Sequence, residues 1–395
     1  MDTIQIKPNI HWVGAIDWDL KHFHGHTYNT IHGGTYNSYL IMDEQVTLID
    51  TVQENFTQNL IDKISQITPL ETIQNIIVNH IEYDHSGALP KLLELAPHIK
   101  LYGTQKAQEG LVKMYGSSWN FTVVKTGDTL NLGQKTLQFL ETPMIHWPDN
   151  MVTYCPQDKI LFSNDAFGQQ YATNERFNDE VDQDILYQEH AKYYASILWP
   201  FANLITNKLK ELEAFDIDMI APSHGVIWRH DLPKLLETYK TWSENQTKPK
   251  VVIVYETMWQ STTTMAQKIA QAIEEAGVEV VVFDIATSDH TQVLYHLFEA
   301  KAYLFGSSTH DNGMLPNLAG FLHFLKGQKP QHRFGAAFGS LGWGGGAVKE
   351  IEELMQATGI EIVQPGIAIK YRPTDEELRQ LYEFGKSFAE KVKSL

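Results

Sequence analysis

The stretch HIEYDHSG, residues 80–87, places His80, Glu82, Asp84 and His85 within six positions. The apolar run TIQNIIVN before it predicts a strand, and SGALPKLLELA after it predicts a helix. Residues 80, 82 and 84 are spaced by two, so their side chains share one face of an extended segment. Imidazoles and carboxylates at this density are typical of a metal site rather than of packing alone.

Three more candidate ligands follow later apolar runs, in the segments ETPMIHWPDN, ILFSNDAFG and DMIAPSHGV. Singly, a histidine after a strand is more often structural, and the aspartate could be a turn residue. Together with the first cluster they offer four imidazoles and three carboxylates, a set that could hold two metal ions with one carboxylate bridging them. The seven candidate ligands are His80, Glu82, Asp84, His85, His146, Asp165 and His224.

Composition limits the classes of protein that are possible. The chain has 395 residues, of which 43% are hydrophobic, so we expect two or three domains with large cores. Its 31 basic against 48 acidic residues give a net charge of −17, which argues against a nucleic-acid partner.

One cysteine, Cys155, excludes an internal disulfide framework, and we expect it to be buried and inert. No signal-like or membrane-spanning segment is visible, so we expect a cytoplasmic protein without a membrane partner.

The polar segment WSENQTKPK, residues 242–250, predicts a linker between two domains, 1–248 and 249–395. After the linker, strands alternate with helices, which predicts an α/β doubly wound, five-stranded parallel sheet. Before it, short strands and helices alternate, and the candidate ligands fall on loops that follow strands. The expected second-domain strands are 251–255, 278–285, 302–308, 333–340 and 360–369, and the helices are 262–276, 290–300, 317–327, 344–358 and 374–393.

Three loops of the second domain point to a ligand. YETMWQSTTTMA (255–266), GSSTHDNGMLP (306–316) and GSLGWGGGAVKE (339–350) follow three of its strands, at the edge where such sheets bind ligands. The first loop is rich in hydroxyls and opens a helix, so it could hold a phosphate monoester, although such loops also cap ordinary helices. Trp343 stands among five glycines, a setting that favours stacking on a flat ring.

At this point the sequence resembles known families. HxHxDH followed by a distant His, Asp and His is the pattern of the metallo-β-lactamase fold, but Glu82 replaces its second histidine. A carboxylate makes the site harder and more anionic, which suits iron better than zinc. The whole chain, domain order included, resembles the flavodiiron proteins. This resemblance implies an αββα metallo-β-lactamase-like sandwich followed by a flavodoxin-like FMN domain.

The resemblance also implies roles for the candidate ligands. His80, Glu82 and His146 would hold one iron ion, Asp84, His85 and His224 the other, and Asp165 would bridge them. In some members the histidine that matches His85 is turned away from iron. The segments FHGHTYNTIHGGTYNSYL (23–40) and KYYASILWPF (192–201) match family signatures, in which His24 and Tyr193 would line the substrate pocket as catalytic residues. His26 departs from the aromatic residue expected there.

For the second domain, the resemblance to flavodoxin implies FMN. Gln260 departs from the glycine often found in the first loop. The phosphate would lie on the first loop and the ring between the other two. The implied FMN-binding residues are Thr257, Met258, Trp259, Ser261, Thr262, Thr309, His310, Asp311, Asn312, Ser340, Leu341, Gly342, Trp343, Gly344 and Gly345.

The function that the resemblance implies is electron transfer from FMN to a non-haem diiron centre. That centre would reduce dioxygen to water, nitric oxide to nitrous oxide, or both. The family also implies a head-to-tail homodimer or a dimer of dimers. No rubredoxin-like CxxC segment is visible, so we expect a separate electron donor, such as a rubredoxin-like protein, a flavin reductase or a reduced deazaflavin.

Two other functions remain compatible with the sequence. One is a metal-dependent hydrolase of the metallo-β-lactamase type fused to a flavodoxin, which would bind zinc. The other is an electron carrier whose first domain is only structural. The sequence does not distinguish between dioxygen and nitric oxide, because the ligand set would serve both.

Overall fold

The computed structural model describes residues 3–25, 27–116 and 118–395. They form two compact units. The first comprises the described residues up to Phe23 together with Thr30–Lys240, and the second comprises Thr241–Leu395 with a short segment that ends at Asn29. The domain boundary proposed at 248/249 falls at the start of β17 (Lys248–Glu256), which follows α7 (Leu232–Ser243).

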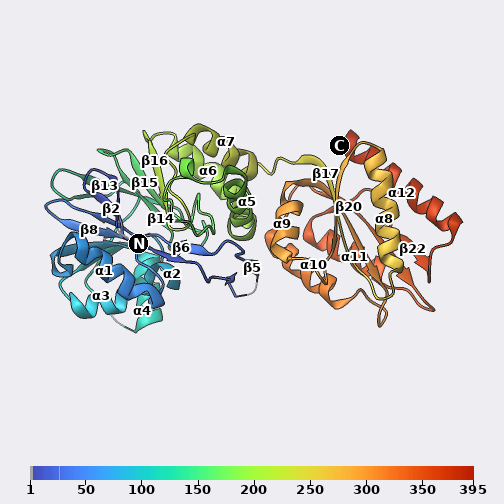
Figure 1. Ribbon diagram of the computed structural model, residues 1–395, viewed down its shortest axis with the longest axis horizontal. Coiled ribbons are helices and arrows are strands. Elements are labelled where there is room, and N and C mark those ends of the chain that lie inside the picture. Colours follow the sequence, from blue (N-terminus) through green and yellow to red (C-terminus); the bar gives the residue numbers. More distant parts are fainter. Residues whose placement is uncertain (1–2, 26, 117) are drawn as a thin grey trace. The chain divides into compact units, whose positions relative to one another are not determined.

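The first unit contains two sheets packed face to face (Figure 1). The first sheet has seven strands, and the second has five, in the order β12-β13-β14-β15-β16. A short pair, β3 (Ala15–Asp17) and β6 (Gly34–Tyr36), lies apart from both. In sheet order, the first sheet consists of β1 (Ile4–Lys7), β2 (Ile10–Trp12), β7 (Tyr39–Ile41), β8 (Val46–Ile49), β9 (Ile73–Ile77), β10 (Lys100–Gly103) and β11 (Phe121–Val123). The second consists of β12 (Thr129–Asn131), β13 (Thr136–Glu141), β14 (Met151–Cys155), β15 (Ile160–Asn164) and β16 (Met219–Pro222).

Alternation of side chains along these strands builds an αββα sandwich. Ile41 and Ile77 of the first sheet pack with Phe139 and Phe162 of the second in one buried cluster. Figure 1 shows α1, α3 and α4 on one side of the sandwich and α6 and α7 on the other. The fold class expected for this half of the chain is confirmed. The helices of this unit are α1 (Thr57–Ile67), α2 (Tyr83–Ser86), α3 (Leu89–Leu95), α4 (Gln105–Tyr115), α5 (Gln183–Tyr193), α6 (Ala202–Leu212) and α7.

The second unit is a parallel sheet in the order β18-β17-β19-β20-β21, with β22 also pairing with β20. This is the flavodoxin strand order, and the predicted doubly wound fold is confirmed. The strand expected at 360–369 is divided into β21 and β22, because Pro365 and Gly366 interrupt it. The other strands are β17, β18 (Glu279–Asp284), β19 (Ala300–Ser308) and β20 (Phe334–Leu341); β21 is Glu361–Ile362 and β22 is Ile367–Lys370.

Helices cover both faces of this sheet. In Figure 1, α8 and α12 lie on one face and α9, α10 and α11 on the other. Side chains of α8 and α12, among them Ile269 and Phe388, pack with Val251 and Leu304 of the central strands. The helices are α8 (Ser261–Glu275), α9 (His290–Glu299), α10 (Pro316–Gln328), α11 (Ala347–Thr358) and α12 (Asp375–Ser394).

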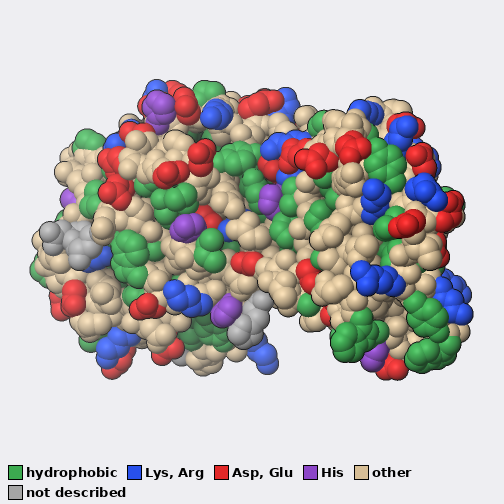
Figure 2. All heavy atoms as spheres, turned by 45° about the vertical axis from the view of Figure 1, so that its right-hand side comes forward, with side chains coloured by type: hydrophobic (Ala, Val, Ile, Leu, Met, Phe, Trp, Pro, Cys, Tyr) green, Lys and Arg blue, Asp and Glu red, His purple; other side chains and the backbone are tan. Residues whose placement is uncertain are grey.

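The charged side chains shown in Figure 2 and the cysteine lie where the composition leads one to expect them, on the surface and in the interior respectively. Acidic and basic side chains are interspersed over the face shown in Figure 2. Cys155 is buried on β14, and burial is the main reason why the pKa of its thiol is raised to about 11. Among the described residues, no helix combines the length and the apolar character needed to cross a membrane.

Gly385 sets the close approach of α12 to α8, so we predict that Gly385→Ala destabilises the protein. An added Cβ would lie 2.6 Å from the Ile269 carbonyl oxygen and 3.1 Å from the Ala272 Cβ. Overpacking of this kind costs about 1–3 kcal/mol. Gly320, in α10, has nothing within 4 Å of such a Cβ, so Gly320→Ala is expected to add about 0.4–1 kcal/mol. Urea unfolding of both variants tests this, and a loss of similar size in both would contradict it.

Candidate functional site

The structure brings the seven predicted ligands together at the ends of strands from both sheets. Asp165 follows β15 and lies between two groups of side chains. Its Oδ1 is 3.2 Å from His85 Nε2 and 3.3 Å from His224 Nε2. Its Oδ2 is 3.3 Å from His146 Nε2 and 3.7 Å from His80 Nε2. Each oxygen of this carboxylate therefore faces a different pair of imidazoles.

The other two carboxylates complete the two groups. Glu82 Oε2 lies 3.4 Å from the Nε2 atoms of both His80 and His146. Asp84 Oδ1 is 3.4 Å from His85 Nε2, and its Oδ2 is 3.2 Å from His224 Nε2. The first group is His80, Glu82 and His146, and the second group is Asp84, His85 and His224. The same two sets were implied by the sequence resemblance. His85 points into the cluster here rather than away from it.

These separations fit side chains that share a cation. Ligand atoms about 2.1 Å from one ion lie about 3.0–3.4 Å from each other in octahedral or tetrahedral geometry. The Nε2 atoms of His80, His85 and His224 are buried and make no hydrogen bond, and neither does Asp84 through either oxygen nor Asp165 through Oδ2. Buried polar atoms without hydrogen bonds are costly unless something else binds them. The donor set therefore fits two metal ions.

The local backbone differs from the sequence expectation. An extended segment through Asp84 was expected, but the chain turns at Glu82, the N-cap of α2. The backbone N–H of His85 and that of Ser86 both donate to the Glu82 carbonyl, and the Ser86 hydroxyl donates to the Ile81 carbonyl. Asp84 and His85 consequently project from a helical turn, which directs them to the second group, whereas His80 and Glu82 serve the first.

Further residues orient the cluster, and the sequence reasoning missed two of them. The Asp149 carboxylate lies 2.9 Å from His80 Nδ1 and accepts a hydrogen bond from the Ile81 N–H. The Thr35 carbonyl lies 2.7 Å from His224 Nδ1. When Nδ1 donates to such partners, the Nε2 lone pair points at the metal position. Tyr193 was predicted as a pocket residue, and its buried hydroxyl donates to Asp165 Oδ1 at 3.0 Å.

The carboxylates control the charge of the imidazoles. Burial alone would lower the pKa of His224, but Asp165 and Asp84 beside it raise the value to about 10. Burial would also lower the pKa of His80, but the carboxylates of Asp149, Glu82 and Asp165 beside it raise the value. Burial would raise the pKa of Asp165, yet the surrounding imidazoles, first among them His85, hold it well below its usual range. Metal ions that bind here would displace the protons that the carboxylates favour on His80, His146 and His224.

The remaining N-terminal candidates are His24 and His26. His24 has a left-handed backbone conformation, with φ of 50°, and belongs to the segment that groups with the second unit. Its role in the substrate pocket stays a prediction. His26, whose effect on the pocket was left open, lies outside the described residues.

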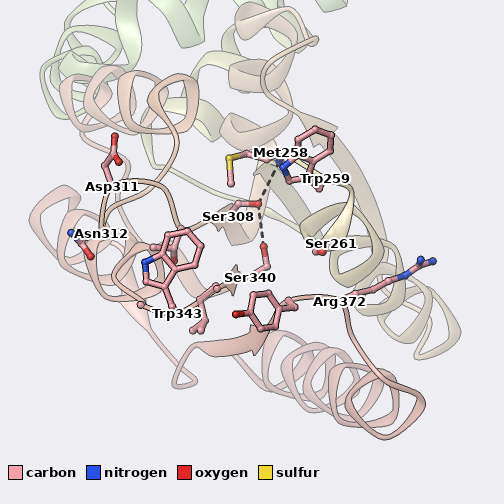
Figure 3. Close-up of a pocket in the computed structure, with 14 residues that line it drawn as sticks. Met258, Trp259, Ser261, Ser308, Asp311, Asn312, Ser340, Trp343 and Arg372 are labelled. Carbon is pink, nitrogen blue, oxygen red and sulfur yellow. Dashed lines mark hydrogen bonds between the residues drawn. The ribbon is translucent and has the colours of Figure 1, made fainter.

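In the second unit, a cavity of about 620 Å³ opens at the carboxyl ends of β17, β19 and β20 (Figure 3). Eleven of the predicted FMN-binding residues line it. Ser308, Tyr371 and Arg372, which the sequence reasoning missed, line it as well, and Arg372 extends away from the hydroxyls in Figure 3. The eleven are Met258, Trp259, Ser261, Thr309, Asp311, Asn312, Ser340, Leu341, Gly342, Trp343 and Gly344.

Four predicted residues do not line the cavity: Thr257, Thr262, His310 and Gly345. Thr262 lies beneath it, because its hydroxyl is 3.0 Å from the hydroxyls of both Ser308 and Ser340. Thr257 precedes the lining segment, and its buried hydroxyl makes no hydrogen bond. His310 instead bridges to Gly313, closing the turn that presents Asp311 and Asn312.

The cavity fits a flat, phosphorylated ligand. Trp259 and Trp343 are 87% and 96% exposed, far more than large aromatic side chains usually are, so their rings are available for stacking. The helix α8 begins at the first loop, with Gln260 as its N-cap at φ 67°. Gln260 thus adopts the left-handed conformation that glycine usually supplies. Backbone N–H groups at this helix start suit a phosphate.

Comparison with known proteins agrees with both halves of this description. The family described as "ODP family beta lactamase" matches residues 35–225, and the flavodoxin family matches residues 253–385. A nitric oxide reductase of Moorella thermoacetica is 44% identical over 98% of both chains. An anaerobic nitric oxide reductase flavorubredoxin of Escherichia coli is 42% identical over 98% of this chain and 82% of its own length.

Solved structures show the same arrangement. The rubredoxin oxygen:oxidoreductase of Desulfovibrio gigas superposes with a TM-score of 0.97 and 35% identity, covering 100% of this chain and 99% of that one. The flavodiiron protein of Giardia intestinalis superposes with a TM-score of 0.96 and 34% identity, over 100% and 97% of the two chains.

The fold and the site define a metallo-β-lactamase-like metal domain joined to a flavodoxin domain. The chain belongs to the flavodiiron proteins. It is an oxidoreductase whose cofactors are FMN and a non-haem diiron centre. These similarities support the oxidoreductase function over a hydrolase fused to a flavodoxin.

Asp149 orients His80, so we predict that Asp149→Asn weakens iron binding. The asparagine amide carries no negative charge, so it accepts the hydrogen bonds of His80 Nδ1 and the Ile81 N–H more weakly than the carboxylate does. Losing a carboxylate that orients a metal-binding histidine typically lowers metal affinity roughly 10–100-fold. Iron retained against a series of chelator concentrations measures this. Asp62→Asn, an exposed change on α1, is the control. Equal iron retention in both variants would show that Asp149 has no orienting role.

Proposed function

We propose that this flavodiiron protein reduces nitric oxide to nitrous oxide, with electrons that enter through FMN. The observation that carries this proposal is the Asp165 carboxylate, whose two oxygens face two separate groups of buried donors. The choice of nitric oxide is supported by the relatives of 44% and 42% identity, which are both named nitric oxide reductases. Dioxygen reduction to water is the second candidate, favoured by the likeness to the oxygen oxidoreductase.

For the metal ligands, we propose the sets that the distances support. His80, Glu82 and His146 would hold one iron ion, and Asp84, His85 and His224 would hold the other. Asp165 would contribute one oxygen to each, because Oδ1 faces the second group and Oδ2 the first. Glu82 in place of an imidazole gives three carboxylates against four imidazoles, a donor set that suits iron in both its oxidation states.

When bound, FMN supplies electrons and the two iron ions bind and reduce the diatomic gas. Reduction of two nitric oxide molecules consumes two electrons and two protons and gives nitrous oxide and water. The Tyr193 hydroxyl oxygen lies 3.0 Å from Asp165 Oδ1, at the centre of the cluster. Its proton is donated to this carboxylate and holds it in place. We propose that Tyr193 and His24 are the catalytic side chains of the pocket, supplying hydrogen bonds or protons.

For FMN, we propose that the phosphate binds the first loop and that the ring stacks between the tryptophans. Ser261 lines the cavity at the start of α8, and the Thr257 hydroxyl is available nearby. Thr262 supports the cavity floor through Ser308 and Ser340. His310 and Gly345 remain predicted contacts.

The partners are also proposals. The Desulfovibrio relative is named as a rubredoxin oxygen:oxidoreductase, and the Escherichia coli relative as a flavorubredoxin. These names support a rubredoxin-like electron donor for this chain. We further propose a head-to-tail homodimer, or a dimer of dimers, which would bring the FMN of one chain to the diiron centre of its partner. A cytoplasmic location stays a prediction from the sequence.

Trp343 is predicted to stack on the flavin ring, so Trp343→Ala should lower FMN affinity roughly tenfold. Loss of one aromatic stacking partner costs about 1–3 kcal/mol. Fluorescence titration of the flavin-free protein with FMN measures the change. Trp18→Ala removes an equally bulky side chain, 53% exposed, from the first unit and should leave FMN affinity unchanged. An unaltered affinity in Trp343→Ala would remove this residue from the site.

The function itself is tested on iron- and FMN-loaded protein, reduced without oxygen and followed with electrodes for both gases. We expect faster consumption of nitric oxide than of dioxygen. Asp165→Asn should abolish the consumption of either gas while FMN stays bound, because the amide cannot serve both groups as an anion. Asp216→Asn, with a 73% exposed side chain, is the control. Faster loss of dioxygen would favour the second candidate, and activity in Asp165→Asn would leave the first domain a structural role only.

A further inference from the structure

A small apolar cavity of about 30 Å³ lies in the first unit, between the second sheet and α6. Leu140, Val152 and Leu161 form its floor, and Ile205, Leu209 and Leu212 of α6 form its roof. No function assigned above uses it. The cavity is partly open to solvent, and apolar surface exposed in this way can mark a binding site.

Strand alternation creates the floor of this cavity. Phe139, Met151 and Phe162 point into the core between the two sheets. Their neighbours along the strands, Leu140, Val152 and Leu161, therefore point to the opposite face, beneath α6. Leu140 and Val152 are also directly paired across β13 and β14. The cavity thus belongs to the same sheet whose strand ends carry the metal cluster.

The chain connects this cavity to the metal cluster at two points. Ile145 lines the cavity and precedes His146, and Ala166 lines it and follows Asp165. His146 and Asp165 are within 3.3 Å of each other in the first group of donors. The cavity wall and the metal cluster therefore share two short chain segments, 145–146 and 165–166.

The walls of the cavity suit a small uncharged molecule. Two of its polar wall groups are engaged: the Tyr239 hydroxyl accepts the Phe167 N–H at 2.5 Å, and Lys208 Nζ donates to Glu211 at 2.8 Å. A water needs about 10–15 Å³ of such volume and several polar partners, and the apolar side chains of this wall offer it none. The volume is enough for a diatomic gas, which needs no hydrogen bonds.

We propose that this apolar cavity is a holding site for the diatomic substrate next to the diiron centre. The proposal rests on the proposed function for the identity of its occupant. An uncharged gas of low polarity partitions from water into apolar space, so the cavity raises its local concentration beside His146 and Asp165. Nitric oxide and dioxygen would both enter, and xenon serves as the probe.

The test combines xenon binding with filled-cavity variants. Crystals of the iron- and FMN-loaded protein under xenon pressure should show xenon between Val152, Leu161 and Leu209. Leu209→Phe places a larger side chain in the roof, and Val152→Ile adds one methylene group to the floor should the first variant fold poorly. Leu204→Phe is the matched control, since Leu204 lies on the same helix and is 42% exposed.

In the filled variants we expect xenon to be lost, kcat/KM for the gas to fall about threefold, and kcat at saturating gas to be unchanged. Iron and FMN contents should equal those of the control. Absence of xenon in the unmodified protein would overturn the proposal, and so would an unchanged kcat/KM in a variant that excludes xenon. Failure of the unmodified protein to consume either gas would instead overturn the proposed function, whatever the xenon result.

Discussion

The shared carboxylate of Asp165 is the interaction on which the metal domain depends, and the chain supports it from both sheets. Asp50, buried after β8, accepts hydrogen bonds from the N–H and the side-chain amide of Asn79, at 2.7 and 2.9 Å. Asn79 immediately precedes His80. The side-chain amide of Asn164, the residue before Asp165, also reaches Asp50, at 3.5 Å. One buried carboxylate therefore links the residue before His80, at the end of the first sheet, to the residue before Asp165, at the end of the second.

Both domains place their chemistry where strands end, yet they use these positions in different ways. In the sandwich, carboxylates and imidazoles are buried and almost completely enclosed, which suits ions that must be held in fixed geometry. In the flavodoxin-like sheet, Trp259 and Trp343 stand in solvent around a wide cavity, which suits a large planar cofactor that exchanges electrons with a partner. The protein thus separates a closed site, where a gas reacts, from an open one, where electrons enter.

Much of this architecture could be predicted from the sequence, because motif residues follow apolar runs that reliably form strands. The seven cluster residues and the five-stranded parallel sheet were identified in this way, whereas most of the cavity lining came from the resemblance to flavodoxin. Asp149, Thr35 and Ser308 were not, since each acts through a partner far away in the chain and no local pattern marks it. The helical turn at Tyr83–Ser86 was missed because alternating polar residues imitate a strand, whereas the hydrogen bonds to the Glu82 carbonyl decide the conformation.

The burial of Cys155 has a consequence for an enzyme that handles nitric oxide or dioxygen. Thiolates, rather than thiols, react readily with oxidants and nitrosating species. Cys155 is the chain's one cysteine, enclosed on β14, with a pKa of about 11 that keeps its thiol protonated at neutral pH. The polypeptide therefore presents no reactive sulfhydryl to the by-products of its own turnover.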